Sequence, residues 1–514
     1  FKKKKKIQKM DSESQILAQI ESEIQKWWDT PRYTGVKRPY TARQVASLRP
    51  SIHIEYPSNI QAKKMWRLLK DAQLTGNFHM TYGALDPIQV INLSKYLKTV
   101  YVSGWQCSVS ASTTNEPGPD FADYPADTVP NKVDQLFKAQ LNQDKIQNQE
   151  RSSMTPEQRA KKPRVDYLAP LLADADAGFG GLTSTMKLIK LFIQAGAAGI
   201  HIEDQRPGNK KCGHMGGKVI VSCREHVNRL IACRLQADIM GTELIILART
   251  DALGAKLIDS NIDPIDQPYI LGICDDGKER SFPEAGLQQI KKQFQGAQRD
   301  QISQQWMSKC YTMSYQQAIQ YAKTLGFSFQ FDWETNRSSE GFYNIEGSPE
   351  LCAARANEYL KYADMVWMET PTPTIETATK FASLVKKVHP NKLLAYNLSP
   401  SFNWSAFGMS NEYIQGFCEQ LGKLGYSWQF ITLAGFHMNA LKSEQLSKDL
   451  AQRHMLAYVE TVQREEEKHK VDQLTHQKWS GVNYVDECLT LIQPDSKTLA
   501  NSIESTENQF SKNH

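Results

Sequence analysis

The sequence predicts an α/β protein built around a (β/α)8 barrel of the TIM type. Eight short apolar, β-branched runs recur along the 514 residues, helical-period segments separate them, and each run ends near a polar side chain. Alternating strands and helices are typical of a parallel sheet covered by helices. Eight such units close a barrel whose active site lies at the carboxyl ends of its strands.

The eight expected strands supply a set of polar side chains at their ends. The strands are residues 98–104, 167–176, 198–204, 244–250, 328–334, 365–370, 393–399 and 428–435. Their terminal polar residues are Tyr101, Ser103, Asp174, Asp176, Glu203, Arg249, Asp332, Glu369, Asn397, Ser399 and Thr432. A single strand with a polar end could simply be leaving the core. Eight together indicate a site for a divalent cation and an anionic substrate.

The segments around these strands give the domain organisation. The roughly 75 residues between the fourth and fifth expected strands exceed the usual βα connection, which indicates an insertion. We expect an N-terminal tail and helical region, the first part of the barrel with a catalytic loop, an inserted helical subdomain, the second part of the barrel, and C-terminal helices with a lid or tail. Their respective ranges are 1–97, 98–252, 253–326, 327–445 and 446–514.

Composition excludes several classes of function. The net charge is only +5, and much of it lies in the first ten residues, "FKKKKKIQKM". We therefore expect no nucleic-acid partner. The sequence has no run of 18 apolar residues, so no membrane association is expected. The nine cysteines form no C-x-x-C pair, which favours reduced thiols over a disulfide framework.

The two ends of the sequence bear on location. Met10 precedes a capped helical pattern, and we expect it to be the biological start. The last residues, "QFSKNH", do not form an S-K-L type of address. A cytoplasmic location and a peroxisomal or glyoxysomal one reached by another signal are both left open.

The segment "LLADADAGFGG" provides two carboxylates at the end of one strand. Asp174 and Asp176 are two residues apart, so both side chains leave the strand on one side. Alternatively, Asp176 only caps the helix that follows. Together with Asp120 and Glu203 they would overload a site with negative charge unless a cation lay among them. Oxygen donors of this kind favour Mg²⁺.

The glycine-rich segment "NKKCGHMGG" at 209–217 contains a cysteine and a histidine two apart. A zinc site would need a second Cys/His pair, and a redox pair would need a second nearby cysteine. An activated thiol remains, since cations such as Lys210, Lys211 and His214 are expected to lower the pKa of Cys212. The other alternative is that Cys212 and His214 lie in a mobile surface loop.

Eight blocks of the sequence resemble the isocitrate lyase family, in its eukaryotic form. In the family's order they are "SGWQC", "NEPGPDFADYP", "DTVPNKV", "GAAGIHIEDQ", "KKCGHMGGKV", "ARTDA", "NLSPSFNW" and "QFITLAGFH". The resemblance implies a barrel of the isocitrate lyase and phosphoenolpyruvate mutase superfamily. It also implies cleavage of isocitrate to glyoxylate and succinate in the glyoxylate cycle, with Mg²⁺ or, as a substitute, Mn²⁺. The implied assembly is a homotetramer with swapped C-terminal helices.

The resemblance also implies roles for individual residues. Asp174 would be the metal ligand, with Asp120, Asp176 and Glu203 around the metal mainly through water. Cys212 would donate a proton and Tyr101 would be the general base, with His214, Glu203 and Arg249 as further catalytic residues. Substrate would be held by Ser103, Gly104, Trp105, Gly213, Arg249, Glu369, Asn397, Ser399, Ser401 and Thr432.

Two alternatives to isocitrate cleavage are kept. One is a 2-methylisocitrate lyase, which would use the same machinery on a substrate that is larger by one methyl group. Relatives specific for that substrate tend to have Ser where this sequence has Thr432. The other is an inactive barrel that serves as a scaffold, which the presence of a suitable residue at every expected position disfavours.

Overall fold

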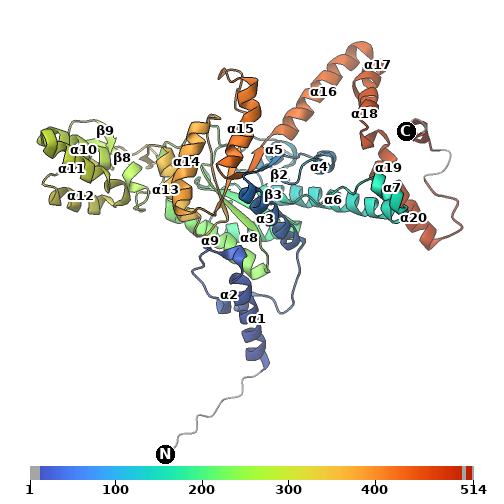
Figure 1. Cartoon of the computed structure of the whole chain (residues 1–514), viewed down its shortest axis with the longest axis horizontal. Coiled ribbons are helices and arrows are strands. Elements are labelled where there is room, and N and C mark those ends of the chain that lie inside the picture. Colours follow the sequence, from blue (N-terminus) through green and yellow to red (C-terminus); the bar gives the residue numbers. More distant parts are fainter. Residues whose placement is uncertain (1–11, 501–504, 512–514) are drawn as a thin grey trace, which may run out of the picture. The chain divides into compact units, whose positions relative to one another are not determined.

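The computed structural model of the chain describes residues 12–500 and 505–511 (Figure 1). The basic segment 1–10, with Met10, lies outside these ranges, and so do the last three residues. The chain divides into two compact units. The first consists of Phe1–Gly83, Lys98–Asp134 and Pro170–Thr432, and the second of Ala84–Leu97, Gln135–Ala169 and Leu433–His514. None of the helices in the described ranges has both the length and the apolar character needed to span a bilayer.

The first unit contains the predicted barrel. Its eight parallel strands pair in the order β1, β14, β13, β12, β6, β4, β3, β2. They are β1 (His79–Tyr82), β2 (Val100–Val102), β3 (Leu171–Asp174), β4 (Gly199–Glu203), β6 (Ile245–Thr250), β12 (Met365–Met368), β13 (Leu393–Asn397) and β14 (Tyr426–Ile431). A bridge between Gly83 and Tyr101 joins the end of β1 to β2, so the sheet closes. The fold class predicted from the sequence is confirmed.

Helices surround the barrel and cover the outer faces of its strands. Every residue of β3, β4 and β6 is buried, as parallel strands covered on both faces require. Outside the insertion, the α-helices that lie wholly in this unit are α1 (Ser12–Trp28), α2 (Ala42–Leu48), α3 (Pro57–Thr75), α5 (Gly104–Ser110), α8 (Leu182–Ala195), α9 (Cys223–Met240), α13 (Pro349–Tyr359), α14 (Ile375–Val388) and α15 (Asn411–Lys423).

One of the eight expected strands is wrong. Segment 328–334 contains only β10 (Phe331–Asp332), which pairs antiparallel with β8 (Leu271–Cys274) outside the barrel. Asp332 is exposed and accepts a hydrogen bond from Thr335, so it is not part of the site. The missing barrel strand is β1, within the region 1–97 that we expected to be helical. Its four residues, only one of them fully buried, are too short a pattern to stand out.

The insertion has a core of its own, which includes residues just past 326, and the expected domain bounds stay predictions. It contains β8, β9 (Glu279–Ser281), β10, α10 (Phe282–Gln293), α11 (Gly296–Met307) and α12 (Tyr315–Thr324), and Figure 1 shows the three helices grouped. Trp306 is fully buried at its centre and donates to the carbonyl of Pro283 at 2.7 Å. Phe327 and Phe331 pack there. The aromatic run that suggested a barrel strand therefore serves this smaller core.

The strand register brings polar residues to one level at the carboxyl end of the barrel. Asp174 pairs with His201, and Arg249 pairs with Glu203 on one side and Trp367 on the other. The segments that follow the barrel strands in the chain form a second, short sheet. It consists of β5 (Val219–Ile220), β7 (Leu257–Ile258) and β11 (Tyr343–Asn344). It fixes the ends of the loops that follow β4 and β6.

The second unit is helical. It contains α4 (Pro87–Ser94), most of α6 (Thr128–Ser152), α7 (Pro156–Lys161), α16 (Ala434–Arg453), α17 (Met455–Tyr458), α18 (Arg464–Lys468), α19 (His476–Ser480), α20 (Val482–Ile492) and α21 (Asn508–Ser511). The helical segment after the last strand is interrupted at His454, where φ is 52°, and a π-helical turn, Val459–Gln463, follows. The exchange of C-terminal helices between subunits stays a prediction.

A buried ion cluster ties the N-terminal region to two barrel strands. The carboxylate of Asp364, just before β12, accepts from Arg32 at 2.6 Å and from Arg234 at 2.7 Å. It also accepts from the backbone N–H of Ile246 in β6 at 2.9 Å. Burial alone would raise the pKa of Asp364, but the two guanidinium groups outweigh burial and hold it well below its usual value.

Asp364→Asn should lower the free energy of unfolding by about 3–5 kcal/mol, because two buried arginines would lose their anion. Urea unfolding followed by circular dichroism measures this. Since the folded pKa is depressed, the contribution is present above the unfolded pKa of about 3.9 and is lost as the pH falls below it. The control is Asp300→Asn on α11, whose side chain is 68% exposed. An equal loss in both variants would contradict the role of Asp364.

Candidate active site

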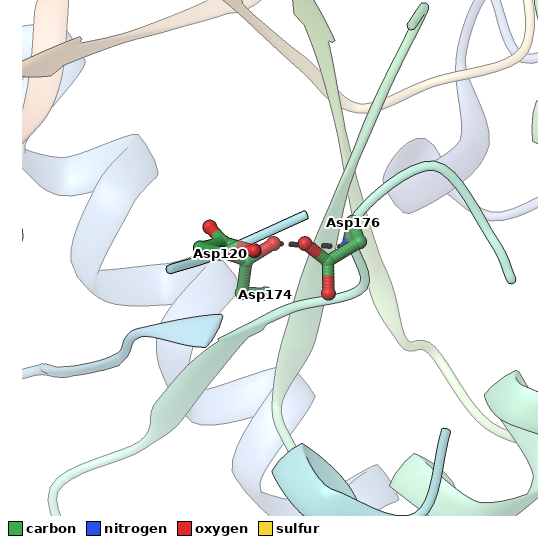
Figure 2. A group of neighbouring side chains, drawn as sticks. All are labelled: Asp120, Asp174 and Asp176. Carbon is green, nitrogen blue, oxygen red and sulfur yellow. Dashed lines mark hydrogen bonds between the residues drawn. The ribbon is translucent and has the colours of Figure 1, made fainter. Parts of the chain in front are cut away.

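Three buried aspartates lie together at the carboxyl end of the barrel (Figure 2). Asp174 ends β3, Asp176 follows it in the loop, and Asp120 comes from the segment between α5 and α6. One carboxylate oxygen from each lies within 4.8 Å of the others. The backbone N–H of Asp176 donates to Asp174 at 2.9 Å, which orients the pair. Clustered, buried carboxylates are the donor set that a hard divalent cation requires, so this group could hold a metal ion.

Lys210 supplies positive charge to the same cluster. Its ammonium group lies 2.6 Å from Asp120, 2.6 Å from Asp176 and 3.9 Å from Glu203. Burial disfavours the charged lysine, yet these carboxylates outweigh burial and hold its pKa well above the usual value. Burial also dominates at Asp120 and raises its pKa to about 6 despite Lys210. The negative charge of the cluster is thus only partly balanced by this chain.

Tyr101 and His201 form the wall of the site beside Asp174. The Tyr101 hydroxyl lies 3.4 Å from Asp174 Oδ2 and 3.0 Å from His201 Nε2. Burial, together with Asp174, holds the pKa of Tyr101 well above 10. Burial lowers the pKa of His201 well below 6.5, so its ring is neutral. His201 is a site residue that was not expected from the sequence, although it lies two residues before Glu203 and so on the same side of β4.

Two close contacts fix the segment around Gly104. Its N–H donates to Asp174 Oδ2 at 3.1 Å. A Cβ on Gly104 would come within 2.7 Å of the Tyr124 hydroxyl and 2.8 Å of Asp174. Tyr124 in turn donates to Asp176. Tyr124 and Lys210 therefore both contact the acidic cluster. Neither residue was expected from the sequence to belong to a metal site.

Arg249 lies at the centre of the other half of the site. Its guanidinium is 3.0 Å from Glu203 and 3.4 Å from Glu369, and it covers the ring of Trp367 at 4.4 Å. Asn397 donates to Glu369 at 3.1 Å. Burial would raise the pKa of Glu369, but Arg249 outweighs burial and lowers it. The structure therefore brings together four of the residues expected at the strand ends.

The loop with the sequence "KKCGHMGG" lies against this half of the site. His214 Nε2 is 3.1 Å from a carboxylate oxygen of Glu369. A Cβ on Gly213 would come within 2.6 Å of Arg249 and 2.8 Å of Glu369, so only glycine fits. Cys212, between Lys210 and His214, is partly exposed. The loop is thus packed into the site at Gly213, and the alternative of an unattached surface loop is not what the structure shows.

The expected lowering of the Cys212 pKa is wrong for this structure. Burial, followed by the charge of Asp120, raises the pKa of the thiol, and these effects outweigh Lys210 and Arg249. Lys210 and His214 lie against carboxylates instead, and the Lys211 ammonium lies over the ring of Phe121. Cys212 therefore remains a neutral thiol near neutral pH, which suits a group that gives a proton rather than one that takes it.

The remaining expected residues occupy the rim of the same barrel end. Ser103 is buried and its hydroxyl caps α5 by accepting from Gln106 at 3.3 Å, while Trp105 lies in the first turn of that helix. Ser399 accepts from the N–H of Ser401 at 3.1 Å. Thr432 directly follows β14. These residues belong to the loops after β2, β13 and β14, which open onto one end of the barrel.

Comparison with known proteins agrees with this geometry. The model of the isocitrate lyase family matches residues 20–326 and 280–510. An isocitrate lyase of Pinus taeda is 46% identical, with 98% of this chain and 94% of that protein covered. One from Saccharomyces cerevisiae is 44% identical, with 96% and 95% covered. A mitochondrial 2-methylisocitrate lyase of Hypocrea atroviridis is 40% identical, with 95% and 93% covered.

Proposed function

The chain belongs to the isocitrate lyase family, and from this premise we propose that it cleaves isocitrate to glyoxylate and succinate in the glyoxylate cycle. Such an enzyme is a carbon–carbon lyase. The observation that carries the proposal is the position of Cys212 in its loop, between Lys210, which contacts the acidic cluster, and His214, which contacts Glu369. A thiol that stays protonated beside the acidic cluster can deliver the proton that this cleavage needs.

The reaction requires a proton acceptor and a proton donor on opposite sides of the bond that breaks. The hydroxyl proton of isocitrate goes toward Tyr101, and the neutral His201 ring, 3.0 Å away, is within reach of the phenol proton. When the carbon–carbon bond breaks, its electron pair stays on the succinate half. The carbon of the succinate half that carries this electron pair then accepts the proton of the Cys212 thiol. Cys212 is left as a thiolate near Lys210.

The substrate carboxylates need donors and positive charge. Arg249, with Ser103, Gly104 and Trp105, binds the glyoxylate half. Gly213, Asn397, Ser399, Ser401 and Thr432, with Glu369 and His214, hold the succinate half, where charge builds up as the bond breaks. Glu203, paired with Arg249 at 3.0 Å, keeps that guanidinium in place. We also propose a homotetramer, as in the family.

Mg²⁺ is the metal that we propose for the aspartate cluster, with Mn²⁺ as a substitute. Asp174 would be its protein ligand, and Asp120, Asp176 and Glu203 would hold its water molecules. All these donors are oxygens and all are buried, which fits Mg²⁺ better than zinc. When bound, the ion would stabilise negative charge on the oxygen that becomes the aldehyde of glyoxylate.

Cys212→Ser should reduce turnover of isocitrate by a factor of about 100 or more, because a hydroxyl is a far weaker acid than a thiol. Glyoxylate release, followed as its phenylhydrazone, measures this. Binding of succinate with a glyoxylate analogue should be largely kept. A wild-type protein that releases no glyoxylate would contradict the proposed function, and a fully active Cys212→Ser would contradict only the role of the thiol.

Chelation of divalent metal should abolish glyoxylate release, and added Mg²⁺ should restore it, since the acidic cluster otherwise repels an anionic substrate. Asp174→Asn should reproduce the chelated state and should not be rescued by Mg²⁺. The assay is run with Mg²⁺, Mn²⁺ and Zn²⁺ in parallel. Recovery with Zn²⁺ alone would overturn the choice of metal.

The 40% sequence identity to a 2-methylisocitrate lyase supports 2-methylisocitrate as a second candidate substrate. We propose that Thr432 discriminates between isocitrate and 2-methylisocitrate. Its methyl group should crowd the extra methyl of 2-methylisocitrate, a difference worth about 1–3 kcal/mol, so kcat/KM should favour isocitrate at least about tenfold. Thr432→Ser should narrow that gap. Steady-state kinetics of both proteins on both substrates decide the matter. A wild type that prefers 2-methylisocitrate would transfer the proposal to that substrate.

A further inference from the structure

Lys218 connects the Cys212 loop to the barrel. It follows Gly216 and Gly217 at the end of the loop and precedes β5. Its ammonium group donates to the carbonyl oxygen of Gly213 at 2.7 Å and to Asp251 Oδ1 at 2.9 Å. The side chain is only 4% exposed. A lysine so deeply buried must keep both of its oxygen partners, because an unpaired ammonium would be costly there.

Asp251 is the residue of the barrel to which Lys218 is attached, and it also holds Arg249. Its Oδ2 accepts from Arg249 Nε at 3.0 Å, and its Oδ1 accepts from the second guanidinium nitrogen at 3.3 Å. The fork-shaped contact fixes the plane of the guanidinium as well as its position. One carboxylate thus orients the cation expected to bind substrate and the lysine that holds the loop.

Asp251 has its own rigid support. Its N–H donates to Asp204 Oδ1 at 2.9 Å, and Asp204 also accepts from Arg355 at 3.1 Å. Arg355 reaches the carbonyl of Val221 at 2.7 Å, beyond the far end of the loop. Because all these groups are buried, Asp251 cannot shift without breaking several charged hydrogen bonds.

A glycine at position 254 leaves room for the Lys218 ammonium. A Cβ on Gly254 would come within 3.0 Å of its nitrogen. On the loop side, Gly213 packs closely on Arg249 and Glu369, where a Cβ would come within 2.6 Å of Arg249, and its carbonyl accepts from Lys218. Gly213 directly follows Cys212, so the hydrogen bond from Lys218 fixes the backbone next to the thiol.

We propose that Lys218 and Asp251 form a latch, defined as this lysine–aspartate pair with the Gly213 carbonyl, that positions Cys212 for proton delivery. The proposal rests on the proposed function for its chemistry. Neither side chain touches the reacting atoms, so both are positioning residues. A purely structural ion pair would explain the Asp251 contact but not the second hydrogen bond to the middle of the loop.

The latch predicts different kinetic effects for its two members. Lys218→Met should lower kcat by about 10- to 100-fold with little change in KM, because the thiol is misplaced while Arg249 keeps its partners. Asp251→Asn should lower kcat and also raise KM, since Arg249 is released as well. The matched control is Lys256→Met, an exposed lysine on the neighbouring loop, which should behave as the wild type.

A second measurement does not depend on activity. The rate of Cys212 alkylation by iodoacetamide, followed by mass spectrometry of the Cys212 peptide, reports how well the loop is held. The plateau of the rate at alkaline pH is compared, so that a shift in the thiol pKa does not contribute. Lys218→Met and Asp251→Asn should each raise this plateau rate of Cys212 alkylation roughly threefold or more, because the loop that carries Cys212 would open more often.

The two readouts separate the possible failures. A wild type that cleaves no isocitrate would contradict the proposed function, but the alkylation rates would still test the latch. Alkylation and kcat both unchanged in Lys218→Met would overturn the latch itself. If Lys218→Met does not fold, Lys218→Gln replaces it, since its shorter, neutral amide cannot serve both partners, and the same rise in alkylation is expected.

Discussion

The arrangement of the site follows from one constraint, the burial of excess negative charge at the carboxyl end of the barrel. Burial of a carboxylate is costly unless a cation or several donors compensate. The strands themselves provide Arg249 as compensation, and two further buried cations, Lys210 and Lys218, come from the loop after β4. The loop is therefore drawn into the site on both sides of Cys212 by electrostatic attraction, and its glycines allow the backbone to follow.

The same constraint links the two halves of the site. Asp120 and Asp176 are partners of Lys210 and also two of the three carboxylates that could hold a metal. A cation bound there would share two of these carboxylates with Lys210, which lies two residues before the thiol in the sequence. Placement of the loop and occupancy of the cluster therefore depend on the same carboxylates, whereas Lys218 and Asp251 hold the loop independently of that cluster.

The sequence predicted the barrel and its polar end because both depend on local patterns. Seven of the eight expected strands are present, and Asp174, Glu203, Arg249, Glu369 and Asn397 do converge. The short β1 and the aromatic run near Phe331 were misassigned, since periodicity does not reveal which core a residue joins. The Cys212 pKa was misjudged for a related reason. A lysine close in sequence lowers a thiol pKa effectively only when carboxylates do not neutralise its charge, and those carboxylates, Asp120 and Asp176, are long-range contacts.

The floor of the site explains why charge dominates its chemistry. Trp367, Trp428 and Phe430 fill the barrel below Arg249 and Tyr101, with ring centroids of Trp428 and Phe430 4.4 Å apart. An apolar, close-packed floor excludes water, so charges above it are weakly screened and pKa values shift far from their solution values. Arg249 rests on Trp367 while its nitrogens face three carboxylates. Small displacements of the guanidinium therefore change the electrostatic energy strongly, and the fork-shaped contact with Asp251 holds the guanidinium plane against them.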